Sequence, residues 1–275
     1  MCIRDRFRRW CCSATSPLAV LTFTEAQLMA WVTPVLWPFL RVLGVFTTAP
    51  VFSSRAFPVR ARIGLAFMIA LCAQATLDTP PMIGLNDAAM LGTLVQQVGI
   101  GMAIGFSVRM VFAAVEFAGE LVGLQMGLNF ASFFDPVSSG QTSAVSRFFG
   151  NIAVLFFVVI NGHLTVLMAV IRSFEAFPVG GSLLQALART RMHELGTELF
   201  ASAMWIALPM IGLLLFVNFT LGIVSRVAPQ MNIYAIGFPV TLTAGLAGIA
   251  LVLPMMEQPL LALMERMITT AAGGR

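Results

Sequence analysis

The proline-free apolar stretch Ala88–Leu128 decides the fold and reads AAMLGTLVQQVGIGMAIGFSVRMVFAAVEFAGELVGLQMGL. As one helix it would be about 60 Å long, twice the thickness of the hydrocarbon core of a bilayer. The stretch must therefore either break into two helices or project beyond the membrane. The residues alone leave both possibilities open.

The composition of the whole chain agrees with a membrane setting. Hydrophobic residues make up 59% of the 275 residues and charged residues only 10%, with a mean hydropathy of +0.91. Soluble domains carry roughly a quarter charged residues, so lipid or other protein must surround this chain. Long apolar runs without strand alternation predict an all-α, polytopic helical membrane protein. The net charge of +4 gives no reason to expect a nucleic-acid partner.

Other apolar segments are long enough to be spans or parts of spans. They are Leu28–Phe52, Ile63–Leu77, Phe148–Ile171, Leu199–Val224 and Ile233–Met256, with a helical tail to about Thr270. Asn161 and Gly162 could break the third of these. The short connection SRVAPQMN makes the last two antiparallel neighbours, which predicts a helical hairpin. Arginines place two loops in the cytoplasm, but only if Ala88–Leu128 crosses twice or not at all.

Small residues recur at helical spacing inside the long stretch. Gly119, Gly123 and Gly127 follow one another at intervals of four, and Gly101 and Gly105 form a second pair. Such spacing lets helix backbones approach closely in a membrane. We therefore predict tight packing here, although the spacing does not identify the partner.

Charged residues share a face with these glycines. Arg109, Glu116 and Glu120 lie within about 40° of one another around the helix. Ionised groups at bilayer depth are costly unless paired or hydrated, so this face does not meet lipid. The charges either pair internally to hold helices together or line a hydrated or inter-subunit surface. Arg41, isolated on its own span, allows the same two interpretations.

The stretch ends in an aromatic break, NFASFFDPVSSGQ, from Asn129 to Gln141. Phe130, Phe133 and Phe134 precede Asp135-Pro136, and serines and Gly140 follow, which is typical of a loop. The residues alone favour a surface loop anchored at the membrane interface. The alternative is a loop whose aromatic side chains seal a pore.

No catalytic, metal or cofactor-binding site is expected. The HELGTE segment at His193 lacks the second histidine of a zinc-protease helix. There is no phosphate-binding glycine loop and no nucleophile motif. The alternative function is a small-solute secondary transporter or channel subunit, and a transporter predicts an internal repeat and a polar midplane site.

Four segments in order resemble the FliR family of the flagellar type III export apparatus. They are RVLGVFTTAPVFSSRAFPVRARIGLAF, GLQMGLNFASFFDP, FFVVINGHL and SRVAPQMNIYAIGFPVTLTAG. The resemblance covers about residues 21–267. It implies a subunit of an export gate in the bacterial inner membrane, at the flagellar basal body. The implied partners are FliP-, FliQ- and FlhB-like subunits and unfolded flagellar export substrates.

The resemblance also implies a division of the chain. Residues 21–194 correspond to a FliP-like part and residues 195–267 to a FliQ-like hairpin, followed by a tail over residues 268–275. We interpret residues 1–20 as a non-native or mis-called N-terminal extension.

By the same resemblance, residues 127–143 are the plug of the pore, which reverses the interpretation from the residues alone. The plug residues are Phe130, Phe133, Phe134, Asp135 and Pro136, with Gly127 and Gly140 as hinges. Gly119, Gly123, Gly127, Arg109, Glu116 and Glu120 are expected at helix packing or subunit interfaces.

Overall fold

The computed structural model describes residues 25–54, 57–74, 88–128, 143–181, 192–228, 230 and 233–272. These residues form helices and no strand, which confirms the all-α prediction. The helices are α1 (Glu25–Thr48), α2 (Pro50–Ser53), α3 (Val59–Gln74), α4 (Ala88–Gln125), α5 (Ala144–Val159), α6 (Gly162–Ala176), α8 (Met192–Val227), α9 (Ile233–Val252), the 3₁₀ turn η2 (Leu253–Met256) and α10 (Glu257–Ala271). Four described helices are long and apolar enough to cross a membrane, or five spans if the bent pair α5–α6 counts as one.

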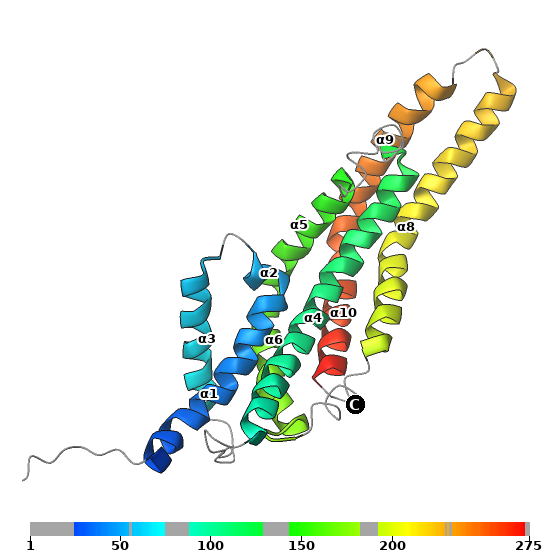
Figure 1. The fold of residues 1–275 in the computed structure, drawn as a ribbon. Helices are drawn as coiled ribbons and strands as arrows, with labels where there is room; N and C mark the ends of the chain where they lie inside the picture. The colour runs from blue at the N-terminus through cyan, green and yellow to red at the C-terminus, as the bar shows by residue number, and fades with distance from the viewer. Residues whose placement is uncertain are drawn as a thin grey trace, which may run out of the picture.

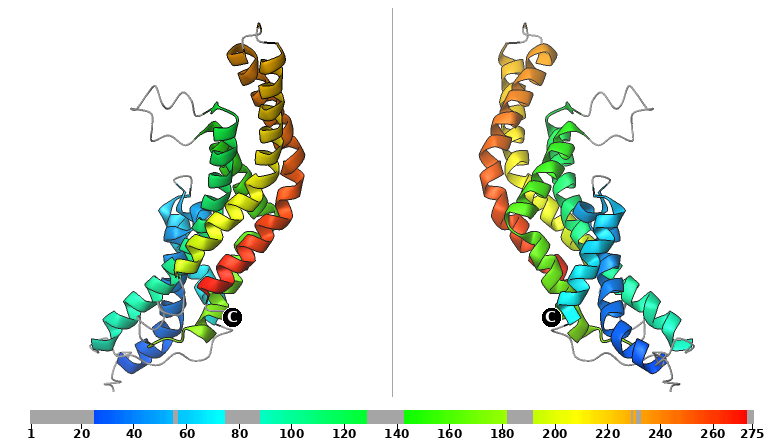
Figure 2. Two further views of the ribbon diagram at one scale, coloured as in Figure 1. Left: turned by 90° about the vertical axis from the view of Figure 1, so that its right-hand side faces the viewer. Right: turned by 90° about the vertical axis from the view of Figure 1, so that its left-hand side faces the viewer.

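Helix α4 is the centre of an elongated bundle (Figure 1). It packs against α1 on one side and against α5, α8 and α10 on the others. Helix α3 lies at the edge of the bundle and packs on α1 through Ala66, Ala70 and Ala73. The two side views in Figure 2 show the α8–α9 hairpin extending beyond the other helices at one end of the molecule.

The long apolar stretch from Ala88 forms one continuous helix. Helix α4 has 38 residues, so it is about 57 Å long at 1.5 Å per residue. Of the two possibilities, the helix therefore projects beyond the thickness of a bilayer and does not break. It ends in a turn in which Gly127 adopts a left-handed backbone conformation with φ +78°.

The break expected at Asn161-Gly162 is confirmed. Helices α5 and α6 meet at an angle of 69°, and Asn161 between them has a left-handed φ of 55°. Asparagine is one of the few residues other than glycine that adopts this conformation readily. The bend turns α6 towards α10, where Gly162 approaches the methyl group of Met264.

Helices α1 and α4 touch through their backbones. A methyl group added at Gly44 would lie 2.7 Å from the carbonyl oxygen of Val98, and one added at Gly105 would lie 2.7 Å from that of Val45. A methyl group at Gly101 would meet the carbonyl oxygen of Arg41. The close approach predicted for Gly101 and Gly105 is therefore confirmed, with α1 of the same chain as the partner.

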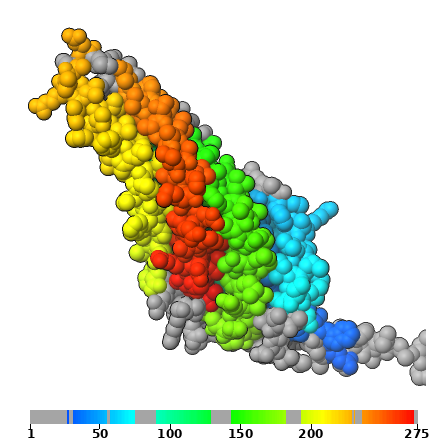
Figure 3. Space-filling model, turned by 180° about the vertical axis from the view of Figure 1, so that it is seen from behind, coloured from blue at the N-terminus to red at the C-terminus, as the bar shows by residue number. Residues whose placement is uncertain are grey.

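The predicted C-terminal hairpin is also present, since α8 and α9 run antiparallel and pack on each other. Seen from behind, α9 and α10 form a continuous ridge beside α5 and α6 (Figure 3). Much of α8 faces outward, with Trp205 75% and Phe216 72% exposed. The isolated chain thus leaves a large apolar surface without a covering helix.

Candidate functional site

The segment expected to be the plug lies outside the described residues, between Leu128 and Ser143. Phe130, Phe133, Phe134, Asp135, Pro136 and Gly140 all belong to it. The structure does describe the two places where this segment leaves and rejoins the helices. We call these two places the stem, consisting of Met126–Leu128 and Ser143–Ser146.

The first half of the stem is held by α9. The side chain of Met126 is fully buried and occupies the space where a side chain at Gly245 would otherwise stand, 2.6–2.7 Å from an ideal Cβ position. The Thr241 hydroxyl lies 3.5 Å from the Met126 carbonyl oxygen, and Phe238 lies beside Gly127. The end of α4 is therefore seated in a notch of α9.

The second half of the stem is held by α4 itself. The backbone N–H of Ser143, the N-cap of α5, donates to Oε2 of Glu120 at 3.2 Å. The Ser143 hydroxyl accepts from the N–H of Ser146 at 3.1 Å, and the Ser146 hydroxyl donates to the Glu116 carbonyl oxygen at 2.8 Å. A carboxylate at a helix N-terminus is favourable because it meets unpaired N–H groups and the positive end of the helix dipole.

Gly119 and Gly123 make room for the same contact. A methyl group at Gly119 would lie 2.9 Å from Cα of Ser146, and one at Gly123 would lie 3.0 Å from the Ser143 hydroxyl oxygen. The start of α5 therefore fills the space in front of Gly119 and Gly123, which we expected at a helix packing or subunit interface. Helix α5 runs back along α4 in the opposite direction, and the small Ser143 and Ser146 at its start fit against the two glycines.

The predicted charged face is divided by this packing. Glu120 is half-buried and binds the stem. Arg109 and Glu116 are exposed in the isolated chain, although the Glu116 side chain runs beside Gly150 of α5. The predicted place of Arg109 and Glu116 at a helix packing or subunit interface stays a prediction.

Arg41, by contrast, is entirely internal. It is 0% exposed and donates to Oε1 of Gln97, to the Ser173 hydroxyl and to the Phe177 carbonyl oxygen, each at 2.9 Å. Its guanidinium also lies 3.5 Å from the centre of the Phe174 ring. This single side chain therefore joins α1, α4 and the end of α6. These partners did not follow from the sequence, although two adjacent glutamines, Gln96 and Gln97, inside an apolar run are a signal for a buried polar contact.

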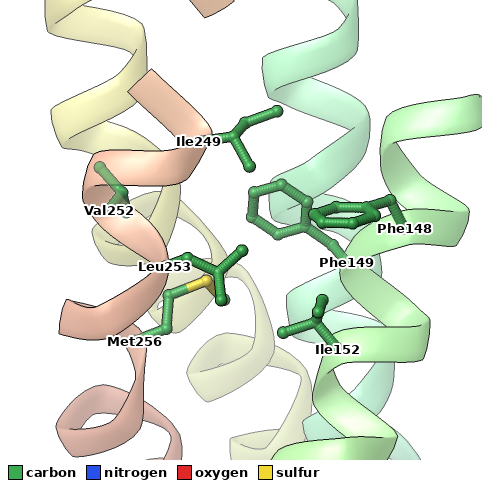
Figure 4. Close-up of a pocket in the computed structure, with 7 residues that line it drawn as sticks. All are labelled: Phe148, Phe149, Ile152, Ile249, Val252, Leu253 and Met256. Carbon is green, nitrogen blue, oxygen red and sulfur yellow. The ribbon is translucent and has the colours of Figure 1, made fainter. Parts of the chain in front are cut away.

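One further concave feature is a narrow crevice between α5 and the α9–η2 corner (Figure 4). It is lined by Phe148, Phe149, Ile152, Ile249, Val252, Leu253 and Met256. All of these side chains are apolar, so the crevice offers no group to orient a polar substrate. Within the described parts of the chain, no group of three or more metal-ligating side chains comes together.

Comparisons with known proteins identify the family of this chain. The family model for "Bacterial export proteins, family 1" matches residues 32–267. The flagellar biosynthetic protein FliR of Escherichia coli K12 is 39% identical over 241 residues, covering 86% of this chain and 90% of the relative. FliR of Pectobacterium carotovorum is 40% identical over 238 residues, with the same coverage, and FliR of Bacillus subtilis is 31% identical over 207 residues, covering 73% and 78%. The chain therefore belongs to the FliR family of bacterial export proteins.

Proposed function

We propose that this chain is a subunit of the flagellar type III protein export gate in the bacterial inner membrane, at the flagellar basal body. It forms part of the pore through which unfolded flagellar proteins leave the cell and carries the segment that closes that pore at rest. FliP-, FliQ- and FlhB-like proteins are its partners in this assembly. The observation that carries the proposal is family membership together with the large exposed apolar surface of the described helices, above all of α8.

The length of this exposed apolar surface can be measured on α8. Its exposed large apolar side chains extend from Phe200 to Val227, about 40 Å along the helix. The hydrocarbon core of a bilayer is about 30 Å thick, and an ordinary tilt of about 20° does not remove the difference. Lipid alone cannot cover this surface, so we infer that helices of other subunits cover part of it.

The stem supports the plug assignment because the helices hold both ends of the aromatic segment in place. Met126 is seated in α9, Ser143 is bound by Glu120, and both ends of the aromatic segment are thereby held at one end of α4. A segment that closes a pore needs fixed ends, so that it can move aside for a passing chain and return to its closed position. Phe130, Phe133 and Phe134 supply the bulk that excludes water, with Gly127 and Gly140 as hinges.

Removal of residues 130–138 tests the plug. We expect the complex to assemble normally and the membrane to become permeable to ions, measured as conductance or as growth inhibition when the complex is expressed. A control that replaces Phe130, Phe133 and Phe134 with leucine keeps apolar bulk and should remain sealed. Normal assembly without any leak on removal of the segment would refute the plug assignment.

Co-purification tests the assembly. The tagged full chain should capture FliP- and FliQ-like proteins from the same bacterium in one stable complex. A chain that purifies alone, while the FliP- and FliQ-like proteins form their own complete complex, would refute the proposed membership.

A further inference from the structure

The interior of the N-terminal half contains a charge whose hydrogen-bond partners are all neutral. The Arg41 guanidinium is 0% exposed, and its three acceptors are an amide oxygen, a hydroxyl and a backbone carbonyl. Burial of an ion is strongly unfavourable unless its surroundings replace the lost hydration. The three acceptors and the Phe174 ring replace a part of it.

Three further polar atoms near Arg41 have no hydrogen-bond partner among the described residues. They are Nε2 of Gln97, Oε1 of Gln96 and Nε1 of Trp37. All three side chains are at most 2% exposed. An unpaired polar atom in an apolar interior loses its hydration without compensation, and native interiors rarely leave such atoms unpaired.

The residues that carry these atoms are connected to Arg41 by a hydrogen bond, or they neighbour it or one of its partners along the chain. Gln97 is the residue whose other amide atom accepts from Arg41. Gln96 donates to the Pro178 carbonyl oxygen at 3.4 Å, which is the neighbour of the Phe177 carbonyl that Arg41 binds. Trp37 lies one turn before Arg41 on the same face of α1. We call this group, Trp37, Arg41, Gln96, Gln97 and Ser173, the Arg41 cluster.

The donor or acceptor character of the three unpaired atoms indicates which kind of ligand can bind them. Two of them, on Trp37 and Gln97, are N–H donors, and the third, on Gln96, is a carbonyl acceptor. A water molecule can accept from an N–H donor and donate to a carbonyl acceptor, so water can pair with each of these atoms. A cation would be repelled by the guanidinium, and an anion would leave the Gln96 oxygen unpaired and repelled.

We propose that the Arg41 cluster is a binding site for ordered water, which completes the hydrogen bonding around the buried guanidinium between α1, α4 and the end of α6. The water pairs with polar atoms of side chains around the buried charge, which the apolar interior would otherwise leave unpaired. The same glutamines, Gln97 and Gln96, also bind Arg41 and the Pro178 carbonyl oxygen directly. This site does not depend on the function proposed above.

Hydroxyl-radical footprinting of the full chain in detergent tests the site, because radicals formed from bound water label neighbouring side chains that bulk water does not reach. We expect Trp37 to be labelled about tenfold more than Phe46 and Phe157, after correction for intrinsic reactivity. Phe46 and Phe157 are matched controls because they are buried to the same extent as Trp37, at 0% and 1% exposure. Labelling of Trp37 at the level of these controls would overturn the proposal. An anion bound in place of water would give the same low labelling, because it forms no hydroxyl radicals.

A density map of the protein at high resolution gives a second, independent measurement. We expect a density peak within hydrogen-bond distance of Nε2 of Gln97 and of Nε1 of Trp37. Side chains that close directly on these two atoms, with no peak between them, would overturn the proposal.

Discussion

The central helix and the C-terminal hairpin are equally apolar but are covered very differently. Within Met90–Gln125 of α4, 61% of the span is buried inside the chain, against 28% for His193–Val227 and 22% for Ile236–Ala271. Their mean hydropathies are 1.9, 2.2 and 2.0. Hydropathy therefore identifies both regions as membrane helices, but it does not tell which of them is surrounded by its own chain. The hairpin must obtain its cover from lipid or from other subunits.

The kinds of contact also differ between the two regions. Helices α1 and α4 meet backbone to backbone at Gly44, Gly101 and Gly105, and backbone atoms cannot move aside. The hairpin packs by inserting flexible side chains into glycine notches, with Met126 at Gly245 and Met210 at Gly248. Methionine adapts to irregular gaps. The N-terminal half should therefore tolerate less change in packing than the hairpin.

The largest loss of stability is expected from Gly101→Val, which tests the α1–α4 contact. The added side chain would collide with the Arg41 carbonyl oxygen, and overpacking against a rigid backbone costs about 3 kcal/mol. We expect poor insertion or a large drop in the thermal unfolding midpoint of the full chain in detergent. Gly92→Val on the same helix is the matched control, because nothing lies within 4 Å of its Cβ position. Equal midpoints for the two variants would show that α1 and α4 do not meet in this way.

Replacement of the buried charge comes next. Arg41→Met removes the guanidinium and leaves the Gln97, Ser173 and Phe177 acceptors without their donor, which should cost roughly 2–3 kcal/mol. The unfolding midpoint should fall clearly, whereas Arg226→Met at an exposed position of α8 should leave it unchanged. A midpoint at or above that of the unmodified chain would mean that apolar packing replaces the polar contacts without loss.

The difference between the two regions was only partly predictable from the sequence. Helix positions, the break at Asn161-Gly162 and the hairpin followed from apolar runs and turn residues, since these are local properties. The partner of each glycine face did not follow, because spacing fixes a face but not the helix opposite it. Gly119 and Gly123 thus face α5, and Arg41 finds partners 56 to 136 residues away. Contacts over such distances depend on the folded topology.

A smaller effect is expected from Gly245→Val in the hairpin. The new side chain would enter the space of the Met126 thioether, but this side chain can adopt another rotamer, so we expect a loss of about 1–2 kcal/mol. Gly237→Val in α9 is the control, with nothing within 4 Å of its Cβ position. A loss as large as that of Gly101→Val, measured in the same unfolding experiment, would contradict the distinction between a rigid and an adaptable region.

The smallest effect is expected within the central region, at the bond between Glu120 of α4 and the N–H of Ser143 at the start of α5. Glu120→Ala removes the acceptor of this N–H and should cost about 1 kcal/mol, chiefly by loosening the first turn of α5. Because this turn can open without unfolding the rest of the bundle, global unfolding should change little while amide hydrogen exchange in residues 143–147 becomes faster. Glu120→Gln keeps an oxygen acceptor but not the charge. Its amide exchange rate in residues 143–147 should therefore lie between those of the unmodified chain and of Glu120→Ala. Unchanged exchange in Glu120→Ala would show that packing on Gly119 and Gly123 alone holds the start of α5, and the stem would then be fixed by shape and not by charge.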